Sequence, residues 1–235
     1  MNYLNRHYFD LGADSQEDAK VSVEAIKQKL EMLNSEIANI DDQSSLELAK
    51  KVQQQAELYQ QLDETDRAWQ LARQTIDRFV EKESWESAVL SCEIMYRSNH
   101  EDALIALGHA LWLSITYPVD ASLTLAQLQY VIDETPSDSD GAAVAAAVAG
   151  YVAEIRTQLD HSNDITLAVG QMMHDVSRRH GQVTNEDEFK AWVQRLELDR
   201  PEKFLIRMRN IIDVLVQDQW WIDRHALQSK LPENS

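Results

Sequence analysis

The stretch from Asp140 to Leu159 constrains the fold of this chain most strongly, because it consists largely of small and apolar residues. Its first half contains GAAVAAAVAG, and the apolar character continues through Tyr151, Val152 and Ile155. Alanine favours helix, and such small side chains let neighbouring helix axes approach closely on more than one side. The stretch is long enough to cross a membrane, but alanine is only weakly apolar and acidic residues crowd its start. We therefore expect a core helix capped by Asp140.

Residues 103–117 form a second strongly apolar stretch and are the expected packing partner of the alanine-rich helix. Gly108 lies within this stretch, where the missing side chain leaves a notch for the close approach of another helix. The large apolar side chains here are Leu104, Ile105, Leu107, Leu111, Trp112, Leu113 and Ile115. We expect these two helices to form the centre of the core.

Glycine and proline are scarce in this chain. Its 235 residues include six glycines and four prolines, whereas average usage is about 7% and about 5%. Alanine, leucine, glutamine and acidic residues dominate, a composition typical of long helices with short connections. We therefore predict an all-α fold that is large enough to bury a substantial core without disulfides or metal.

The formal net charge of −18 limits the classes of partner that the protein can bind. An acidic surface repels nucleic-acid phosphates and anionic membranes unless a local basic patch overrides the overall field. The clustered cations lie at residues 178–180 and 207–209, and each group contains only two or three of them. We expect neither nucleic acid nor membrane as a partner, whereas a basic protein fits the charge.

Cys92 is the single cysteine, which excludes an internal disulfide and fits a reducing compartment. It lies between Leu90 and Ile94 and is followed by Glu93, so we expect a buried, unreactive thiol. The first residues, MNYLNRHYFDLG, lack a charged region followed by an apolar run. We therefore expect neither a signal peptide nor a transit peptide, and a cytoplasmic protein.

Residues 1–14 are expected to form an N-terminal arm that either packs on the body of the protein or is disordered. Apolar residues then recur at alternating spacings of four and three, the heptad pattern of a helix seam. The seam consists of Ala19, Val23, Ile26, Leu30, Leu33, Ile37 and Ile40. Two interpretations are open: the helix packs along a hairpin at residues 46–80, which we favour, or residues 19–40 form a homodimer.

Residues 44–99 predict successive antiparallel helices joined by short turns. Ser44 and Glu47 have the spacing of a capping box at the start of a helix that ends near Leu62. A second helix is expected over residues 66–79, and Ser84 is the expected cap of a third. The segment therefore predicts a run of helical hairpins.

Residues 46–117 resemble the tetratricopeptide family, whose repeats are helical pairs with a period of 34 residues. The first unit is matched by Val52, Ala56, Tyr59 and Ala68, and the second by Trp85, Ala88, Val89 and Cys92. Neither first helix carries Leu-Gly, neither second helix ends in proline, and the last helix is displaced by two to three residues. A first-helix signature in an incompatible register is formed by Leu104, Leu107, Gly108 and Leu111. The resemblance implies an array of antiparallel helical hairpins, as in α-solenoids, and no particular ligand.

Two loops divide the remainder of the chain. The acidic, proline-bearing stretch ETPSDSDG precedes the alanine-rich helix, and a polar break follows that helix at residues 160–164. Further helices are expected over residues 165–180, after a cap at Thr184, and from Pro201 onward. We therefore predict a helical-hairpin domain at residues 15–160 and a C-terminal helical subdomain at residues 161–235.

The seven histidines show no metal-binding pattern, because no two of them are three or four residues apart. The sequence also contains no P-loop, nucleophile elbow, glycine-rich nucleotide turn or paired-cysteine zinc motif. His109 lies inside the apolar stretch and needs a hydrogen-bond partner if it is buried, so we expect a structural polar site there. We predict no metal, no cofactor and no enzymatic activity.

Two of the six tryptophans are candidate partner-binding residues. Four of them fall on apolar helix faces and are expected in the core: Trp69, Trp85, Trp112 and Trp192. Trp220 and Trp221 are adjacent, so on a helix they point about 100° apart and are difficult to bury in one face. Tryptophan is enriched at binding hot spots. This pair is therefore either an exposed anchor for a partner or packed against the preceding helices.

These features together predict a non-catalytic adaptor or assembly factor that presents an acidic helical surface to a basic protein. Two alternatives belong to other classes. One is an acidic inhibitor that mimics nucleic acid, and the other is an enzyme whose site is assembled from isolated residues. The adaptor is favoured by the repeat-like region, the acidic charge and the absence of recognisable catalytic motifs from the sequence.

Overall fold

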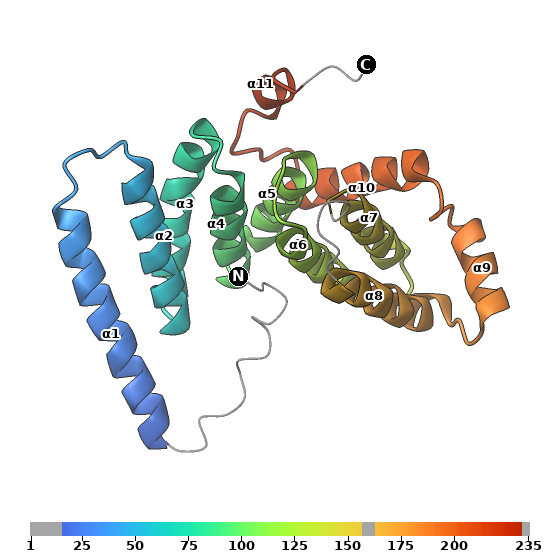
Figure 1. Cartoon of the computed structure of the whole chain (residues 1–235), viewed down its shortest axis with the longest axis horizontal. Coiled ribbons are helices and arrows are strands. Elements are labelled where there is room, and N and C mark those ends of the chain that lie inside the picture. The colour runs from blue at the N-terminus through green and yellow to red at the C-terminus, as the bar shows by residue number, and fades with distance from the viewer. Residues whose placement is uncertain (1–15, 157–162, 232–235) are drawn as a thin grey trace. The chain divides into compact units, whose positions relative to one another are not determined.

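The computed structural model describes residues 16–156 and 163–231, and within these ranges the protein is all-α, with helices packed in adjacent pairs (Figure 1). The predicted fold class is therefore confirmed. The N-terminal arm expected at residues 1–14 lies outside the described residues. Short connections join helices with these bounds: α1 (Gln16–Ala38), α2 (Leu46–Gln61), α3 (Thr65–Glu81), α4 (Trp85–Arg97), α5 (Ala103–Thr116), α6 (Ala121–Glu134), α7 (Gly141–Arg156), α8 (Asn163–Gly181), α9 (Glu186–Arg195), α10 (Pro201–Val216) and α11 (Arg224–Gln228).

Backbone contacts divide the chain into two compact units. One unit contains residues 20–109 and the described residues from 214 onward, and the other contains the described residues of 110–213. This division differs from the boundary that we expected near residue 160, because α7 and α8 pack against each other and belong to the same unit. The observed division instead falls inside α5 and α10.

In the unit of residues 20–109 and 214–235, α2, α3 and α4 pack side by side in chain order (Figure 1). Small residues at the helix contacts are fully buried, which lets the helix axes approach closely. They are Ala56, Ala68, Ala72 and Ala88, each with an exposed fraction of 0%. Phe79, Ile76 and Met95 fill the space between these helices and are equally buried.

The same turn ends α2, α3 and α4. Asp63, Glu83 and Asn99 have φ angles of 61°, 53° and 54°, the left-handed conformation that usually requires glycine. The next residue donates its backbone N–H back into the helix after α2 and α3, as from Ser84 to the carbonyl of Phe79 at 2.8 Å. This chain therefore makes its tight hairpin turns with polar residues, which is consistent with its low glycine content.

Two predicted helix starts are wrong by one residue. Ser45, not Ser44, is the N-cap of α2, and Asn185, not Thr184, is the N-cap of α9. Thr184 instead donates its backbone N–H and its hydroxyl to the carboxylate of Glu188, both at 2.8 Å. In both places two neighbouring polar residues satisfy the sequence rule for a cap, and only the backbone conformation selects one of them.

Among the described seam residues of α1, the buried ones lie in its second half. Leu30 and Leu33 are 6% exposed, whereas Val23 is 39% exposed. Contacts with α2 hold this half, including the ion pair between Lys51 and Glu36, in which the nitrogen and oxygen are 2.6 Å apart. The favoured interpretation, that the helix packs along the following hairpin, therefore describes residues 30–37, and the homodimer through residues 19–40 stays a prediction.

In the unit of residues 110–213, α7 lies against α6 and α8. Ala143, Ala146 and Ala147 are at most 6% exposed, and a Cβ atom placed on Gly150 would lie 3.7 Å from Cγ1 of Val169. The expected core position of the alanine-rich helix is thus confirmed. No helix in residues 16–156 and 163–231 combines the length and hydrophobicity needed to traverse a lipid bilayer.

Arg156, at the C-terminal end of α7, connects α7 to the end of α5 within this unit. Its guanidinium donates at 2.7–3.2 Å to the Thr124 hydroxyl and to the carbonyls of Ser114, Ile115, Tyr117 and Val119. The last carbonyls of a helix have no partner within it, so the cation satisfies the end of α5. Burial lowers the pKa of Arg156, and the nearby Asp120 opposes that shift.

Candidate functional site: an aromatic cluster around His109

His109 is fully buried on α5 and both of its ring nitrogens have partners. Nδ1 lies 2.8 Å from the carbonyl oxygen of Ile105, and Nε2 accepts the backbone N–H of Trp221 at 2.9 Å. Because a carbonyl can only accept, Nδ1 carries the proton and donates it, while Nε2 is unprotonated. These two hydrogen bonds specify a neutral imidazole.

Burial lowers the pKa of His109 from 6.5 to about 4, because the buried site disfavours the charged ring. The guanidinium of Arg73 lowers the pKa further, and the hydrogen bond to Ile105 acts in the opposite direction. The ring is therefore neutral near pH 7, as its acceptor role requires. This agrees with the prediction of a structural polar site.

Trp221 packs on His109 through its ring as well as through its backbone. The two rings are stacked, with centroids 4.4 Å apart and planes 13° apart. The rings of Trp69 and Trp221 are perpendicular, with centroids 6.0 Å apart, and the guanidinium of Arg73 lies over the Trp221 indole at 5.2 Å. Trp221 is thus held by a stacked ring, an edge-on ring, a cation and a hydrogen bond.

The rings of His100 and Trp220 complete what we call the aromatic cluster. Its members are Trp69, His100, His109, Trp220 and Trp221. His100 stacks on Trp69 with centroids 4.1 Å apart, and Trp220 is tilted toward His109 at 5.0 Å. All members except His109 are half-buried. The cluster therefore extends from a buried histidine to solvent.

Gly108 positions the segment that carries the two tryptophans. A Cβ atom on this glycine would lie 2.5 Å from Cγ2 of Val216, so the last turn of α10 can approach α5 only because the side chain is absent. Gln217 and Asp218 then adopt left-handed conformations, with φ angles of 50° and 62°, and end the helix. The predicted notch at Gly108 is thus present, and the chain that leaves it leads to Trp220 and Trp221.

The structure brings together residues that the sequence suggested separately. His109 was expected to need a partner and Trp221 was a candidate anchor, and each is the partner of the other. Sequence reasoning placed Trp69 in the core, where it is only half-buried, and gave no role to His100 or Arg73. No local pattern could have found them, because the cluster joins residues more than 100 positions apart.

The described residues contain no group of three or more His, Cys, Asp or Glu side chains that could hold a metal ion. Cys92 is fully buried, and burial raises the pKa of its thiol to about 12. The thiol is therefore protonated and shielded, as the sequence predicted.

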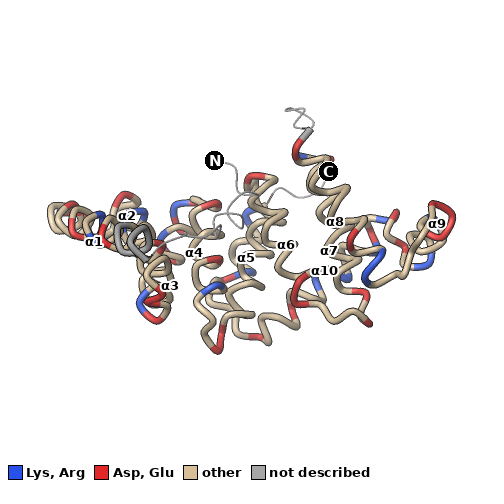
Figure 2. The backbone as a smooth tube through the Cα atoms, turned by 90° about the horizontal axis from the view of Figure 1, so that it is seen from below, with Lys and Arg blue, Asp and Glu red and all other residues tan. Residues whose placement is uncertain are grey.

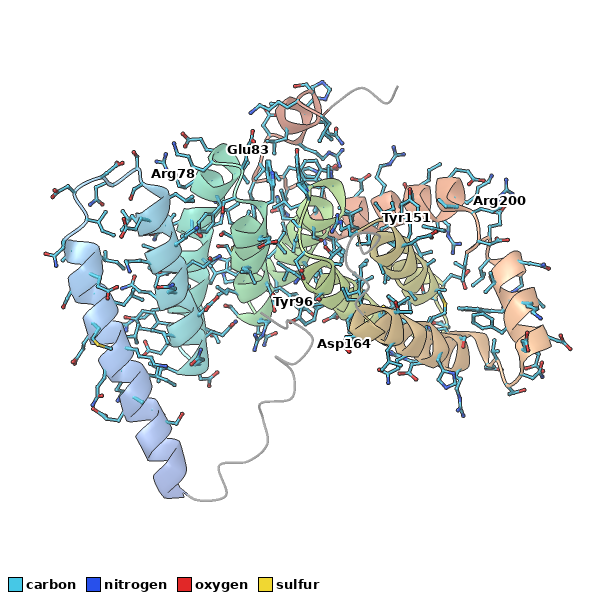
Figure 3. The ribbon with its side chains drawn as sticks, in the orientation of Figure 1. Arg78, Glu83, Tyr96, Tyr151, Asp164 and Arg200 are labelled. Atoms are coloured by element: carbon cyan, nitrogen blue, oxygen red, sulfur yellow. The ribbon has the colours of Figure 1, made fainter. Side chains whose placement is uncertain are left out.

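Acidic residues are distributed over the described parts of the chain (Figure 2). Of those whose exposure the structure describes, only Glu93 is buried. Many lie at helix ends, such as Glu83 after α3 and Asp164 in the first turn of α8 (Figure 3). Within the described residues, the acidic charge is therefore carried at the surface.

Comparison with known proteins gives no relative for this chain. No protein-family model, curated protein or solved structure matches it. The function must therefore be argued from the aromatic cluster, the packing of the helices and the distribution of charge.

Proposed function

We propose that this protein is a non-catalytic adaptor or assembly factor that presents an acidic helical surface to a basic protein partner. The observation that carries this proposal is the exposure of the acidic residues: the described ones, with the exception of Glu93, reach solvent. A surface field of one sign attracts partners of the opposite sign and raises the rate of productive encounter. The cytoplasm is the compartment that fits this proposal and the single buried cysteine.

The packing of α2 on α4 supports the proposed resemblance to tetratricopeptide repeats. The amide of Gln53 donates to the carbonyl of Ser87 at 2.6 Å, and that of Gln60 donates to the carbonyl of Ile94 at 3.0 Å. Each bond joins residues 34 positions apart, which is the period of that family. We therefore propose that α2 and α4 are the first helices of two successive repeat units.

A buried polar network joins the same helices. Gln53 also donates to the hydroxyl of Ser91 at 2.8 Å, and that hydroxyl lies 2.7 Å from the hydroxyl of Thr75 on α3. Buried polar groups require partners, so this network favours one arrangement of α2, α3 and α4. A scaffold that presents a surface to a partner needs such a fixed arrangement.

The proposal is tested by capturing partners from a lysate of the source organism with the purified chain as bait. The informative variant removes three carboxylates from the helix ends: Asp63→Asn, Asp66→Asn and Glu101→Gln. The matched control removes the same charge from the other compact unit: Asp138→Asn, Glu154→Gln and Asp175→Asn. We expect one stoichiometric basic protein, whose affinity falls by about tenfold with the first variant and much less with the control.

Two outcomes would contradict the adaptor. Capture of a nucleic-acid-binding protein that nucleic acid releases would favour the mimic of nucleic acid. A basic partner whose affinity is unchanged by both variants would show that the acidic surface does not recognise it.

A further inference from the structure

The surface around Trp221 is complementary to a tryptophan residue as a whole, including its backbone. We call this surface the indole slot and define it by Trp69 and Arg73 on α3 and His109 on α5. Its aromatic and cationic groups contact the indole ring, while Nε2 of His109 receives the backbone N–H of the same residue at 2.9 Å. The slot therefore recognises a ring and an amide hydrogen together.

The buried acceptor makes this recognition selective. If the indole slot were empty or held a ligand without an N–H donor, Nε2 of His109 would be left without its partner, which is unfavourable for a buried polar atom. A peptide can offer a ring and its own amide N–H at the required spacing. A proline residue at this position cannot donate the hydrogen bond to Nε2 of His109, because its backbone nitrogen carries no hydrogen.

The segment that fills the indole slot is short and irregular. Residues 217–223 connect α10 to the five-residue helix α11 and form no helix of their own. Segments with few regular backbone hydrogen bonds open at lower free energy than packed helices. Two acidic residues, Asp218 and Asp223, flank the two tryptophans, and the half-buried Arg73 lies over the ring of Trp221.

We propose that the indole slot is a recognition site for a tryptophan-bearing segment of a partner protein, and that residues 218–223 occupy it in the free chain. The chemistry of the ligand is read from the contacts of the occupant: an indole and its backbone N–H. The partner segment and the chain's own segment compete for the same site. This inference goes beyond the proposed function, because it does not depend on the acidic surface.

The test uses the full chain with Trp221→Ala, which empties the indole slot, and a fluorescent peptide with the sequence of residues 217–225. Binding is measured by fluorescence anisotropy. A tethered segment competes at an effective concentration of about millimolar, so the peptide should bind the variant at least about tenfold more tightly than the wild-type chain. Trp85→Ala is the matched control, because it removes a half-buried tryptophan from α4 and leaves the slot filled.

Three further comparisons decide the outcome. A peptide with alanine at the position of Trp221 should not bind, and equal binding of both peptides would overturn the proposal. If Trp221→Ala does not fold, Trp221→Phe is used, and a folded Phe variant that binds no more tightly than the wild-type chain would also overturn it. If the Ala variant prefers the segment of an added wild-type copy to the peptide, the occupant is a second copy and not a different protein. Failure here leaves the lysate capture unaffected, so the two proposals can fail separately.

Discussion

His109 can hold the C-terminal segment only while its ring is neutral. Protonation would place a hydrogen on Nε2, where the ring now accepts the backbone N–H of Trp221. The buried site secures the neutral form by lowering the pKa of this histidine to about 4. Protonation of His109 is thus coupled to the packing of residues 217–223.

This linkage predicts how stability depends on pH. The folded pKa of about 4 lies below the unfolded value of 6.5, so between these values the unfolded state binds more protons. The contribution is fully present above pH 6.5 and is lost as the pH falls toward 4, by about 3 kcal/mol in the free energy of unfolding. Urea denaturation across this range measures it. His109→Gln should remove this part of the pH dependence and His225→Gln should not, and equal slopes in all three proteins would contradict the linkage.

Two helical glycines have opposite surroundings, which gives a matched pair of substitutions. Gly108→Ala places a methyl group 2.5 Å from Cγ2 of Val216, with Cβ of Leu215 at 3.3 Å. Gly170 on α8 has no neighbour within 4 Å of an added Cβ atom. Gly170→Ala should therefore stabilise by about 1 kcal/mol through helix propensity, whereas Gly108→Ala should destabilise by about 1–3 kcal/mol through overpacking. The midpoints of chemical unfolding distinguish the two, and stabilisation by both would show that α10 does not need the notch.

The sequence predicted the role of a single residue where the chemistry of that residue alone imposes a requirement. A histidine inside an apolar stretch needs a partner, and a glycine inside a helix marks a close approach, so His109 and Gly108 could be predicted. The identity of their partners could not, because Trp221 and Val216 reach them through tertiary packing that no local spacing encodes. The N-caps of α2 and α9 were misplaced because adjacent polar residues compete for the same role.

At the scale of helices, α7 shows how composition fixes a position in the fold. Its alanines leave no apolar face to distinguish from a polar one, and ten of its residues are buried. We expected α5 as a neighbour of α7, which packs on α6 and α8 and meets α5 where Arg156 satisfies the carbonyls. Small side chains predict that a helix is surrounded, and they do not specify by which helices.

The burial of α7 predicts that enlarging one of its residues is costly. Ala146 is 1% exposed, so Ala146→Leu should overpack the unit and destabilise it by about 1–3 kcal/mol. Ala25→Leu is the matched control, because Ala25 is an exposed residue of α1. Thermal unfolding followed by circular dichroism measures both. An unchanged melting curve for Ala146→Leu would place α7 at the surface.

At the scale of the whole molecule, the all-α class followed from composition, whereas the division into units did not. Periodicity located the helices along the chain, and polar loops suggested a boundary near residue 160. The observed division passes through α5 and α10, so two continuous helices contribute residues to both units. A boundary inside a helix leaves no loop, proline or change in composition for sequence reasoning to detect.

If the acidic surface attracts a basic partner, the association rate constant must depend on salt concentration. Steering between exposed charges is screened beyond a Debye length of about 8 Å at physiological ionic strength. With the partner from the lysate capture and stopped-flow mixing, we predict that the association rate constant falls by about tenfold or more from low to high salt, while the dissociation rate constant changes little. An association rate constant that does not respond to salt would show that the acidic surface does not attract the partner.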